Sequence, residues 1–384
     1  MNILILNWRD PKHPLAGGAE QVMREHAKKW IEKGNTVTWF ASSYTNAKPK
    51  DKIENITIIR QGSHYTVHLR AYFFLRNKKN NFDIIIDNFH FLPFFTPLYL
   101  PRNKIIAFIN EPAKKAWFVN IMFPFSILGF LVEPLFFQFY KNISFITAAS
   151  SIIQELNKYG IKESDIHLIH HGFVKNVTLE QAKREKKPTV VYLSQLSPDK
   201  GIEDAVRAVS MLVKKKLDLQ FWIIGKAKDT DFEKKIKKQV VDMGIDSNTI
   251  FLGFVSEKEK FMRLGKAWVL IHPSIREGWG LNVIEAASVG TPSVGYNVTG
   301  LSDSIKKLVS RKFVVKDLPL PVVPRTSPCF AGSSESNKSN GKREFSRVKN
   351  SIFDSFVPIQ GWCKDNNCNT ASVLNVCFLK LKIE

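Results

Sequence analysis

The stretch that decides the organisation of the chain is Arg276–Pro292, which reads REGWGLNVIEAASVGTP. It follows an apolar run, Trp268–Ile271, that predicts a buried strand. Its glycine-containing loop leads into a short helix. The backbone N–H groups at a helix N-terminus have no partner within the helix, and they favour the binding of an anion. Two glutamates, Glu277 and Glu285, flank the loop. Eight residues of ideal helix rise roughly 12 Å, about the span from a sugar ring across a diphosphate to a ribose. The stretch therefore predicts a nucleotide-sugar site with one carboxylate at each end.

A structural explanation of the same stretch stays open. Asn282 and Glu285 have the N-x-x-E spacing of a capping box, in which Glu285 would cap its own helix. Glu277 would then be a carboxylate on a surface loop. On this stretch alone, the sequence is consistent with a ligand site and with a helix cap.

Length and charge narrow the class of protein. At 384 residues the chain is long enough for two domains, each with its own core. The formal net charge of +21 indicates an anionic partner, such as a phosphorylated substrate, an acidic lipid surface or nucleic acid, unless it reflects a lysine-rich proteome. The basic excess is spread along the chain and no common nucleic-acid motif is present, so we do not expect nucleic acid as the partner.

The cysteines and the first residues bear on the compartment. All four cysteines lie after residue 328: Cys329, Cys363, Cys368 and Cys377. Nothing earlier could pair with them, and their spacing is not a zinc pattern, so we predict a reduced, cytoplasmic protein. Met1–Trp8 is apolar, but it is short and has no basic leader. This predicts a first buried strand and not a signal peptide.

Apolar runs alternate with amphipathic helical patterns twice along the chain. The first series runs from Asn2–Trp8 to Ile166–Ile169, and the second runs from Thr189–Leu193 to Ser293–Tyr296. This alternation predicts an α/β fold with two doubly wound parallel sheets that face each other across a cleft. We predict a first domain over 1–172, a linker over 173–188, a second and incomplete domain over 189–310, and an irregular or disordered tail over 311–384.

Three short features stand near the ends of predicted strands. Gly17-Gly18 follows the first strand, where glycine lets a phosphate approach the backbone; a tight turn is the alternative. Lys200 follows the first strand of the second half and could reach a diphosphate, or it could be one more solvated lysine. Asp229-Thr230-Asp231 resembles a metal-binding D-x-D pattern, but we interpret it as a helix N-cap and first turn. We predict no metal.

The segment Trp117–Tyr140 is almost entirely apolar. Two prolines and a central glutamate, Glu133, argue against a membrane-spanning helix. The segment is either a buried helix pair or an apolar surface that enters an anionic membrane interface beside basic residues such as Lys141. The second alternative predicts a peripheral protein at the inner face of the plasma membrane.

The motif Glu277-x7-Glu285 resembles that of the retaining glycosyltransferases of family 4, whose GT-B fold has two Rossmann-like domains. The resemblance covers about Met1 to Ile305, with supporting matches at Gly17-Gly18-Ala19-Glu20, Asp199-Lys200-Gly201, Phe251–Val255 and Gly290-Thr291-Pro292. It implies transfer of a sugar from a nucleotide-diphosphate sugar to a lipid or glycan acceptor, with retention of anomeric configuration and without a metal. Amides and a cation would stabilise the leaving diphosphate.

The resemblance also implies a role for each matching residue. Glu277 would face the donor sugar, Glu285 the ribose and Lys200 the diphosphate. Backbone amides for the distal phosphate and the sugar would come from Gly278, Trp279, Gly280, Leu281, Asn282 and Val283. Further donor contacts would come from Gly17, Gly18, Gln195 and Val255, and the acceptor side would include Asn110 and Glu111.

The sequence departs from the family pattern at several positions. Ser194-Gln195 stands where a Gly-Arg pair is usual, and Asn110-Glu111-Pro112 stands where a histidine near the sugar is common. His171-Gly172 stands where Asn-Gly is common. The closing helices of the family are not found after about Ser310. The alternative to an active enzyme is therefore a catalytically impaired, nucleotide-sugar-binding remnant with a truncated or frame-shifted C-terminus.

Overall fold

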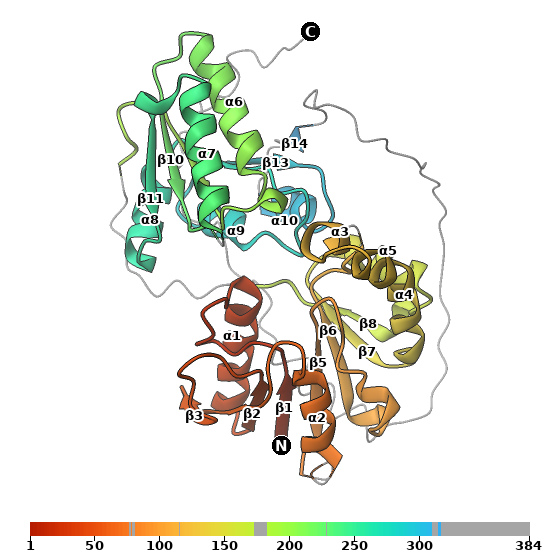
Figure 1. Cartoon of the computed structure of the whole chain (residues 1–384). Helices are drawn as coiled ribbons and strands as arrows, with labels where there is room; N and C mark the ends of the chain where they lie inside the picture. Colours follow the sequence, from red (N-terminus) through yellow and green to blue (C-terminus); the bar gives the residue numbers. More distant parts are fainter. Residues whose placement is uncertain are drawn as a thin grey trace.

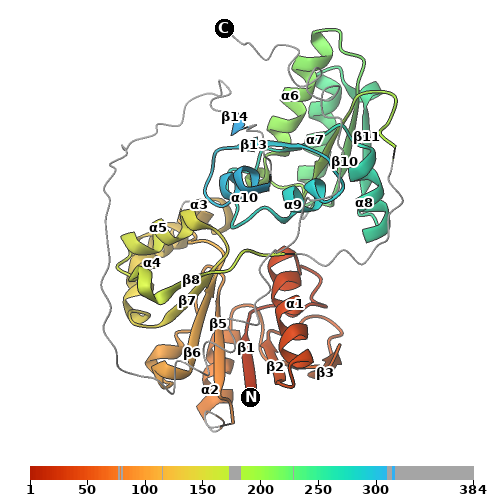
Figure 2. The same ribbon diagram turned by 180° about the vertical axis from the view of Figure 1, so that it is seen from behind.

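The computed structural model describes residues 1–76, 78, 81–114, 116–172, 183–227, 229–308 and 314–315. These residues form two α/β domains, the first below the second in Figure 1 and seen from behind in Figure 2. The four cysteines and nearly all of the tail predicted over 311–384 lie outside the described residues, as does 173–182 of the predicted linker.

The first domain is built on an eight-stranded sheet with the order β3-β4-β2-β1-β5-β6-β7-β8 within the described part of the chain. Its strands are β1 (Asn2–Leu6), β2 (Thr36–Ala41), β3 (Lys50–Ile53), β4 (Ile56–Arg60), β5 (Ile84–Phe89), β6 (Ile105–Ile109), β7 (Ser144–Thr147) and β8 (Ile166–Leu168). Neighbouring strands are parallel, except that β3 pairs antiparallel with β4. The helices are α1 (Gly18–Glu32), α2 (Val67–Arg76), α3 (Ala116–Asn120), α4 (Phe125–Phe139) and α5 (Ser150–Lys158).

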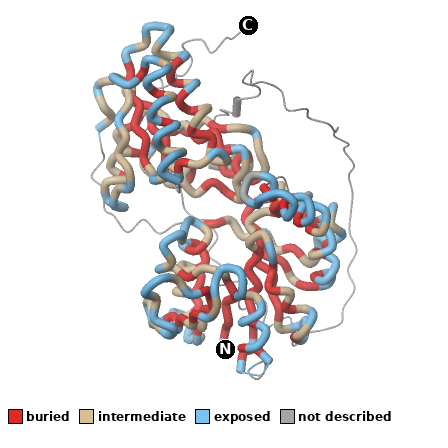
Figure 3. The backbone as a smooth tube through the Cα atoms, viewed as in Figure 1, coloured by how far each residue is buried: buried red, intermediate tan, exposed pale blue. Residues whose placement is uncertain are grey.

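Both faces of this sheet are covered. Side chains alternate along a strand, so β1 contributes Leu4 and Leu6 to one core and Ile3 and Ile5 to the other. The first core is completed by apolar residues of α2, α4 and α5, and the second by one face of α1. Figure 3 shows the strands as the buried centre of the domain.

The second domain carries a parallel sheet with the order β11-β10-β9-β12-β13-β14 in the described residues. Its strands are β9 (Thr189–Leu193), β10 (Gln220–Ile224), β11 (Thr249–Gly253), β12 (Val269–His272), β13 (Ser293–Tyr296) and β14 (Val314–Val315). Its helices are α6 (Ile202–Lys214), α7 (Thr230–Asp242), α8 (Glu257–Lys266), α9 (Leu281–Ala287) and α10 (Leu301–Leu308). One core lies under α6 and α7, and the other lies under α8, α9 and α10. The two parallel-sheet domains confirm the predicted α/β architecture.

Two predictions about helix starts have different outcomes. Asp229 is the N-cap of α7, and its carboxylate accepts a hydrogen bond from the Asp231 amide at 2.9 Å, which confirms the cap expected there. The capping box of Asn282 and Glu285 is wrong. Gly280, with φ at +75°, is the N-cap of α9, and the Asn282 amide donates instead to the carbonyl oxygen of Leu193 at 2.6 Å. The side chains that the spacing suggested for a cap therefore serve other contacts.

The apolar segment Trp117–Tyr140 forms a helix pair with two different faces. On the inner side, Glu133 accepts hydrogen bonds from the amides of Ala113 (2.5 Å) and Lys114 (2.7 Å) and from the indole of Trp117 (3.1 Å). A Cβ on Gly129 would lie 2.2 Å from that indole, so the close packing of α3 on α4 requires glycine there. These contacts satisfy the buried carboxylate that interrupts the apolar sequence.

The outer side of the pair is exposed. Large apolar side chains with exposed fractions from 36% to 83% cover it: Phe118, Ile121, Met122, Phe123, Phe125, Ile127, Leu128, Phe130, Leu131, Leu135 and Phe139. We call this set the α3–α4 apolar face. The inner side is packed as the buried-helix alternative expects, and the outer side is an exposed apolar surface whose contact with a membrane stays a prediction. In the described part of the chain, no helix has both the length and the apolarity needed to cross a bilayer.

The two domains touch through the loops at the carboxyl ends of their strands. The Trp279 indole donates to the carbonyl oxygen of His171 at 2.9 Å. The Asp303 carboxylate at the start of α10 accepts hydrogen bonds from Ser150 and Ser151 at the start of α5. These contacts bring the opening stretch of the second domain against the first.

Candidate active site

Glu277 lies in the loop between β12 and α9 and is the centre of an ionic cluster. Its Oε1 is 2.8 Å from Nζ of Lys200 and 3.1 Å from Nε2 of His272. Lys200 ends a short 3-10 helix, Pro198–Lys200, just after β9, and His272 is the fully buried last residue of β12. Adjacent parallel strands end at the same edge of the sheet, so β9 and β12 deliver the cation and the imidazole to one point.

The cluster keeps Glu277 charged. Burial alone would raise the pKa of Glu277, but the Lys200 charge and the His272 hydrogen bond outweigh burial and hold that pKa well below its ordinary value. Burial would lower the pKa of Lys200, and Glu277 reverses this, so the pKa of Lys200 is raised. The site therefore presents a fixed carboxylate and a fixed ammonium group at neutral pH.

Backbones of the two domains approach each other next to this cluster. A Cβ on Gly278 would lie 2.9 Å from the backbone oxygen of Asn110, and a Cβ on Gly18 would lie 3.0 Å from the Leu281 side chain. Gly17 is the N-cap of α1, and its amide donates to Oε2 of Glu20 at 2.7 Å. The glycines predicted to approach phosphates thus stand where the two domains meet.

Glu285 occupies a second carboxylate position on α9. Its Oε1 is 2.8 Å from Nζ of Lys260 on α8. Its Oε2 is buried and has no hydrogen-bond partner among the described residues. Burial raises the pKa of Glu285, and the Lys260 charge only partly opposes this. A buried carboxylate oxygen without a partner is costly unless a ligand completes it.

The other residues predicted to contact the donor are spread over the domain. Val283 is fully buried in the core under α9, so only its backbone faces the loop. Gln195 is exposed, and Val255 is half-buried just before α8. Among the described residues, the hydrogen bonds and ion pairs of Glu277 do not involve Gln195 or Val255. These assignments stay predictions.

The acceptor-side candidates lie opposite Glu277. Asn110 Oδ1 is 3.0 Å from Nε2 of His171, and Glu111 Oε1 is 3.0 Å from Nε of Arg276. Burial raises the pKa of Glu111 to about 7, against the opposing charges of Arg276 and Lys200. Glu111 therefore titrates near neutral pH beside the ionic cluster.

Sequence reasoning missed three partners that complete the site. His272 supports Glu277, Arg276 pairs with Glu111, and Lys260 pairs with Glu285. A polar residue at the end of a buried strand was a signal for His272. Arg276 and Lys260 gave no local signal, because their partners come from distant parts of the chain.

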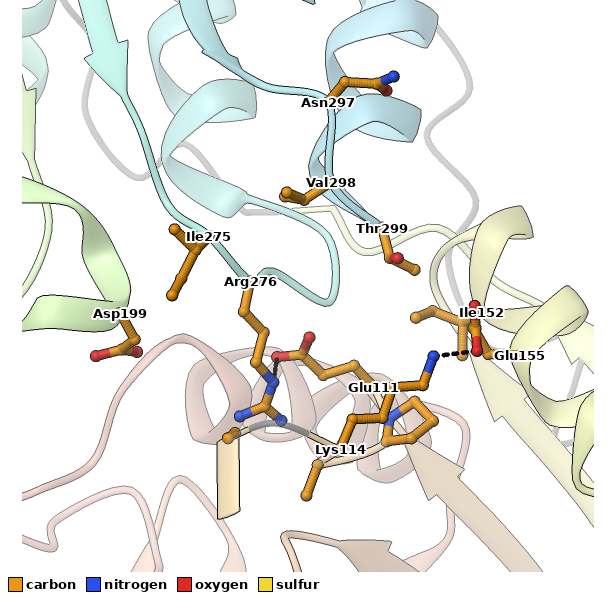
Figure 4. A pocket seen from close by; sticks show the side chains of 13 residues that line it. Glu111, Lys114, Ile152, Glu155, Asp199, Ile275, Arg276, Asn297, Val298 and Thr299 are labelled. Carbon is orange, nitrogen blue, oxygen red and sulfur yellow. Dashed lines mark hydrogen bonds and ion pairs between the residues drawn. The ribbon is translucent and has the colours of Figure 1, made fainter. Parts of the chain in front are cut away.

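A cavity of about 510 Å³ opens between the domains beside this cluster, and Figure 4 shows the side chains that line it. Glu111, Lys114, Ile152 and Glu155 come from the first domain, and Asp199, Ile275, Arg276 and the 297–299 loop come from the second. Glu277 and Lys200 do not line it, although their chain neighbours Arg276 and Asp199 do. Its volume is in the range of small-molecule sites. The described residues hold no group of three or more His, Cys, Asp or Glu side chains that could bind a metal ion.

Comparison with known proteins gives consistent results for both halves. The profile of "Glycosyltransferase Family 4" matches residues 16–175, and that of "Glycosyl transferases group 1" matches residues 176–317. The O-antigen chain mannosyltransferase RfbU of Salmonella typhimurium is 24% identical over 60% of this chain and 59% of that protein. The 2-deoxystreptamine glucosyltransferase of Streptomyces kanamyceticus is 29% identical over 33% of this chain and 32% of that protein. The matched segments span less than two thirds of either relative.

Solved structures give the same architecture. Sucrose-phosphate synthase from Thermosynechococcus elongatus superposes with a TM-score of 0.62 at 17% identity, covering 78% of this chain and 82% of that one. Anabaena HepE, solved with UDP and glucose, superposes with a TM-score of 0.57 at 15% identity, covering 79% and 82%. At these identities the similarity shows the fold alone. Together, the two family profiles and the two facing domains establish that the chain belongs to the family 4 glycosyltransferases and has the GT-B fold.

Proposed function

We propose that the chain transfers a sugar from a nucleoside-diphosphate sugar to a lipid-linked or glycan acceptor, with retention of anomeric configuration and without a metal. The observation that carries the proposal is the Lys200–Glu277–His272 cluster, set where Gly278 approaches the first domain. The names of the relatives support it, since they include glucosyl- and mannosyltransferases and a neighbour solved with UDP-glucose.

Each end of the donor has a matching group. Glu277, held ionised, would accept hydrogen bonds from donor sugar hydroxyls. The unpartnered Oε2 of Glu285 would accept one from a ribose hydroxyl. Lys200, which pairs with Glu277, would lie beside the diphosphate. An oriented cation and loop amides stabilise the charge that develops on a leaving phosphate.

The reaction we propose is a front-side displacement. The bond between the anomeric carbon and the diphosphate oxygen breaks, and its electron pair stays on the diphosphate. The acceptor oxygen forms the new bond on the same face and gives its proton to the departing diphosphate. Lys200 offsets the charge during this step. No carboxylate of the chain is needed as a nucleophile.

A transfer assay tests this function. The chain is incubated with a panel of nucleotide sugars and a panel of glycoside and lipid acceptors, with EDTA or with magnesium, and the anomeric configuration of the product is read by NMR. We expect a product that keeps the anomeric configuration of the donor sugar. We also expect this product to form at the same rate in EDTA and in magnesium. An inverted product, or a strict requirement for magnesium, would contradict the retention or the metal independence.

We further propose that the α3–α4 apolar face contacts an anionic membrane and so brings the enzyme to a lipid-linked acceptor. Eleven large, exposed apolar side chains on one helix pair are unusual for a protein surface exposed only to water. The exposed cations Arg102 and Lys141 lie next to the end of α4, where the Arg102 guanidinium donates to the Lys141 carbonyl oxygen at 2.8 Å. An apolar face with basic residues at its edge matches an anionic lipid interface.

A further inference from the structure

The interdomain cavity is distinct from the place assigned to the donor, yet it adjoins it. One wall is formed by Glu111 and Arg276, which follow Asn110 and precede Glu277. The donor residues Glu277, Lys200 and Glu285 lie outside its lining. A group bound in this cavity would therefore lie next to the donor sugar, against residues of the first domain such as Glu111.

Both cations on the cavity wall are already paired with carboxylates. Lys114 pairs with Glu155, and Arg276 pairs with Glu111, as the dashed lines in Figure 4 show. Asp199 adds a third carboxylate, so the described lining has three acids against two bases. A phosphate needs cations that are free to bind it, and here it would meet carboxylates and occupied cations. The wall thus disfavours an anionic ligand.

The rest of the wall suits a sugar ring. Pro112, Ile152, Ile275 and Val298 present C–H surfaces, and Thr299 adds a hydroxyl group. Carboxylates paired with cations still have free lone pairs for hydroxyl groups. Apolar walls with a few oriented polar groups are typical of a site for an uncharged, hydroxyl-rich ligand.

We propose that this cavity is the acceptor subsite and that it takes an uncharged sugar ring, not a phosphate-bearing head group. This inference rests on the proposed glycosyl transfer. Glu111 is the residue that contacts the reacting hydroxyl, because it lines the cavity and its carboxyl also senses the charges of Lys200 and Glu277. Burial raises the pKa of Glu111 to about 7, so a part of its carboxyl groups is uncharged at neutral pH. A carboxyl in this state suits a hydrogen bond with a neutral hydroxyl group.

Hydrogen bonds join the wall of this subsite to the helix pair that carries the α3–α4 apolar face. Glu133 of α4 binds the amides of Ala113 and Lys114, and both residues line the cavity. A sugar ring in the cavity can thus belong either to a free glycan or to a glycolipid whose chain lies on the apolar face. Both sources share the same ring chemistry, and the experiment separates them.

Saturation-transfer NMR on the full chain tests the proposal. The probes are the methyl glycosides of glucose, galactose, mannose and N-acetylglucosamine, the anionic analogues glucose 6-phosphate and glycerol 3-phosphate, and octyl glucoside below its micelle concentration. We expect signal from at least one methyl glycoside and at least fivefold less from the phosphates. A gain of about tenfold in affinity for the octyl over the methyl glucoside would assign the glycolipid source, and equal affinities would assign the glycan source.

Variants locate the binding. Thr299→Phe fills the cavity and should abolish the glycoside signal, whereas Glu163→Gln, an exposed carboxylate away from the cavity, should leave it unchanged. Glu155→Gln releases Lys114 and should raise phosphate binding relative to glycoside binding. Preference for a phosphate probe in the wild type, no signal from all four methyl glycosides, or a full signal in Thr299→Phe would overturn the proposal. Calorimetry with UDP is run in parallel, so that glycoside binding without UDP binding marks a failure of the proposed function and not of this subsite.

Discussion

Lys200 Nζ lies 2.8 Å from Oε1 of Glu277, and the two residues come from the segments that follow the neighbouring strands β9 and β12 in the second domain. Each keeps the other charged despite burial. The pair is thus set in place before any donor binds, and a diphosphate would meet an ammonium group that is already oriented.

Replacing this lysine should damage catalysis more than binding. Lys200→Ala removes the cation from the leaving diphosphate and is expected to lower kcat by about 100-fold with a smaller change in KM. Lys200→Arg should restore part of the activity. Because Lys200→Ala also leaves Glu277 buried without its partner, urea denaturation is needed to show that both variants are folded. Equal kcat values for the wild type and Lys200→Ala would remove the lysine from the mechanism.

Glu285 and Glu257 both pair with Lys260, so substitutions at these two glutamates form a matched pair of variants. Glu285 and Glu257 each lie 2.8 Å from Lys260 Nζ, but only Glu285 has a buried oxygen without a partner. Glu285→Gln should weaken UDP binding about tenfold, or about 1.4 kcal/mol, because a ribose hydroxyl loses its charged acceptor. Glu257→Gln should change the affinity less than twofold. Isothermal calorimetry measures both, and equal losses would assign Glu285 to the ion pair alone.

The raised pKa of Glu111 predicts a stability profile. Its carboxyl ionises near 4.5 in the unfolded chain and at about 7 in the folded one, so the folded state binds more protons between these values. The free energy of unfolding should therefore fall as pH rises from 4.5 to 7, by at most about 3 kcal/mol from this group, at about 1.4 kcal/mol per pH unit.

Urea denaturation at pH 5 and pH 8 checks this profile. The difference between the two pH values should be smaller in Glu111→Gln than in the wild type, because glutamine does not titrate. Glu163→Gln, which changes an exposed carboxylate, should behave like the wild type. An unchanged difference in Glu111→Gln would show that Glu111 ionises normally.

Some of this organisation was predictable from the sequence. The strand–helix alternation gave both sheets, since apolar runs bounded by turn residues are readable locally. Strand β3 was missed because Lys50, Asp51 and Lys52 make its sequence polar, as is common at an exposed sheet edge.

Other features could not be read locally. Arg276 meets Glu111 only after two domains pack together. The outer face of α4 is as apolar as its inner face, so periodicity could not show which side Phe137 or Leu131 would take. The spacing of Asn282 and Glu285 fitted a cap, but a glycine with positive φ starts the helix instead.

The α3–α4 apolar face predicts membrane binding that depends on lipid charge. Flotation with vesicles of phosphatidylglycerol and phosphatidylcholine should show more bound protein than with phosphatidylcholine alone. The double variant Leu128→Glu, Leu131→Glu should lower binding at least tenfold, because it places two charges on the exposed face. Val241→Glu, at an exposed apolar position of α7, is the control. Equal binding of the double variant and the control would exclude this face as the contact.

We propose that Glu277 belongs to a working donor site. The most direct measurement is release of nucleoside diphosphate from a panel of nucleotide sugars by the wild type, Glu277→Ala and Glu163→Ala. We expect the wild type and Glu163→Ala to release nucleoside diphosphate from at least one donor about 100-fold faster than Glu277→Ala. Equally slow release by all three proteins with every donor would contradict it.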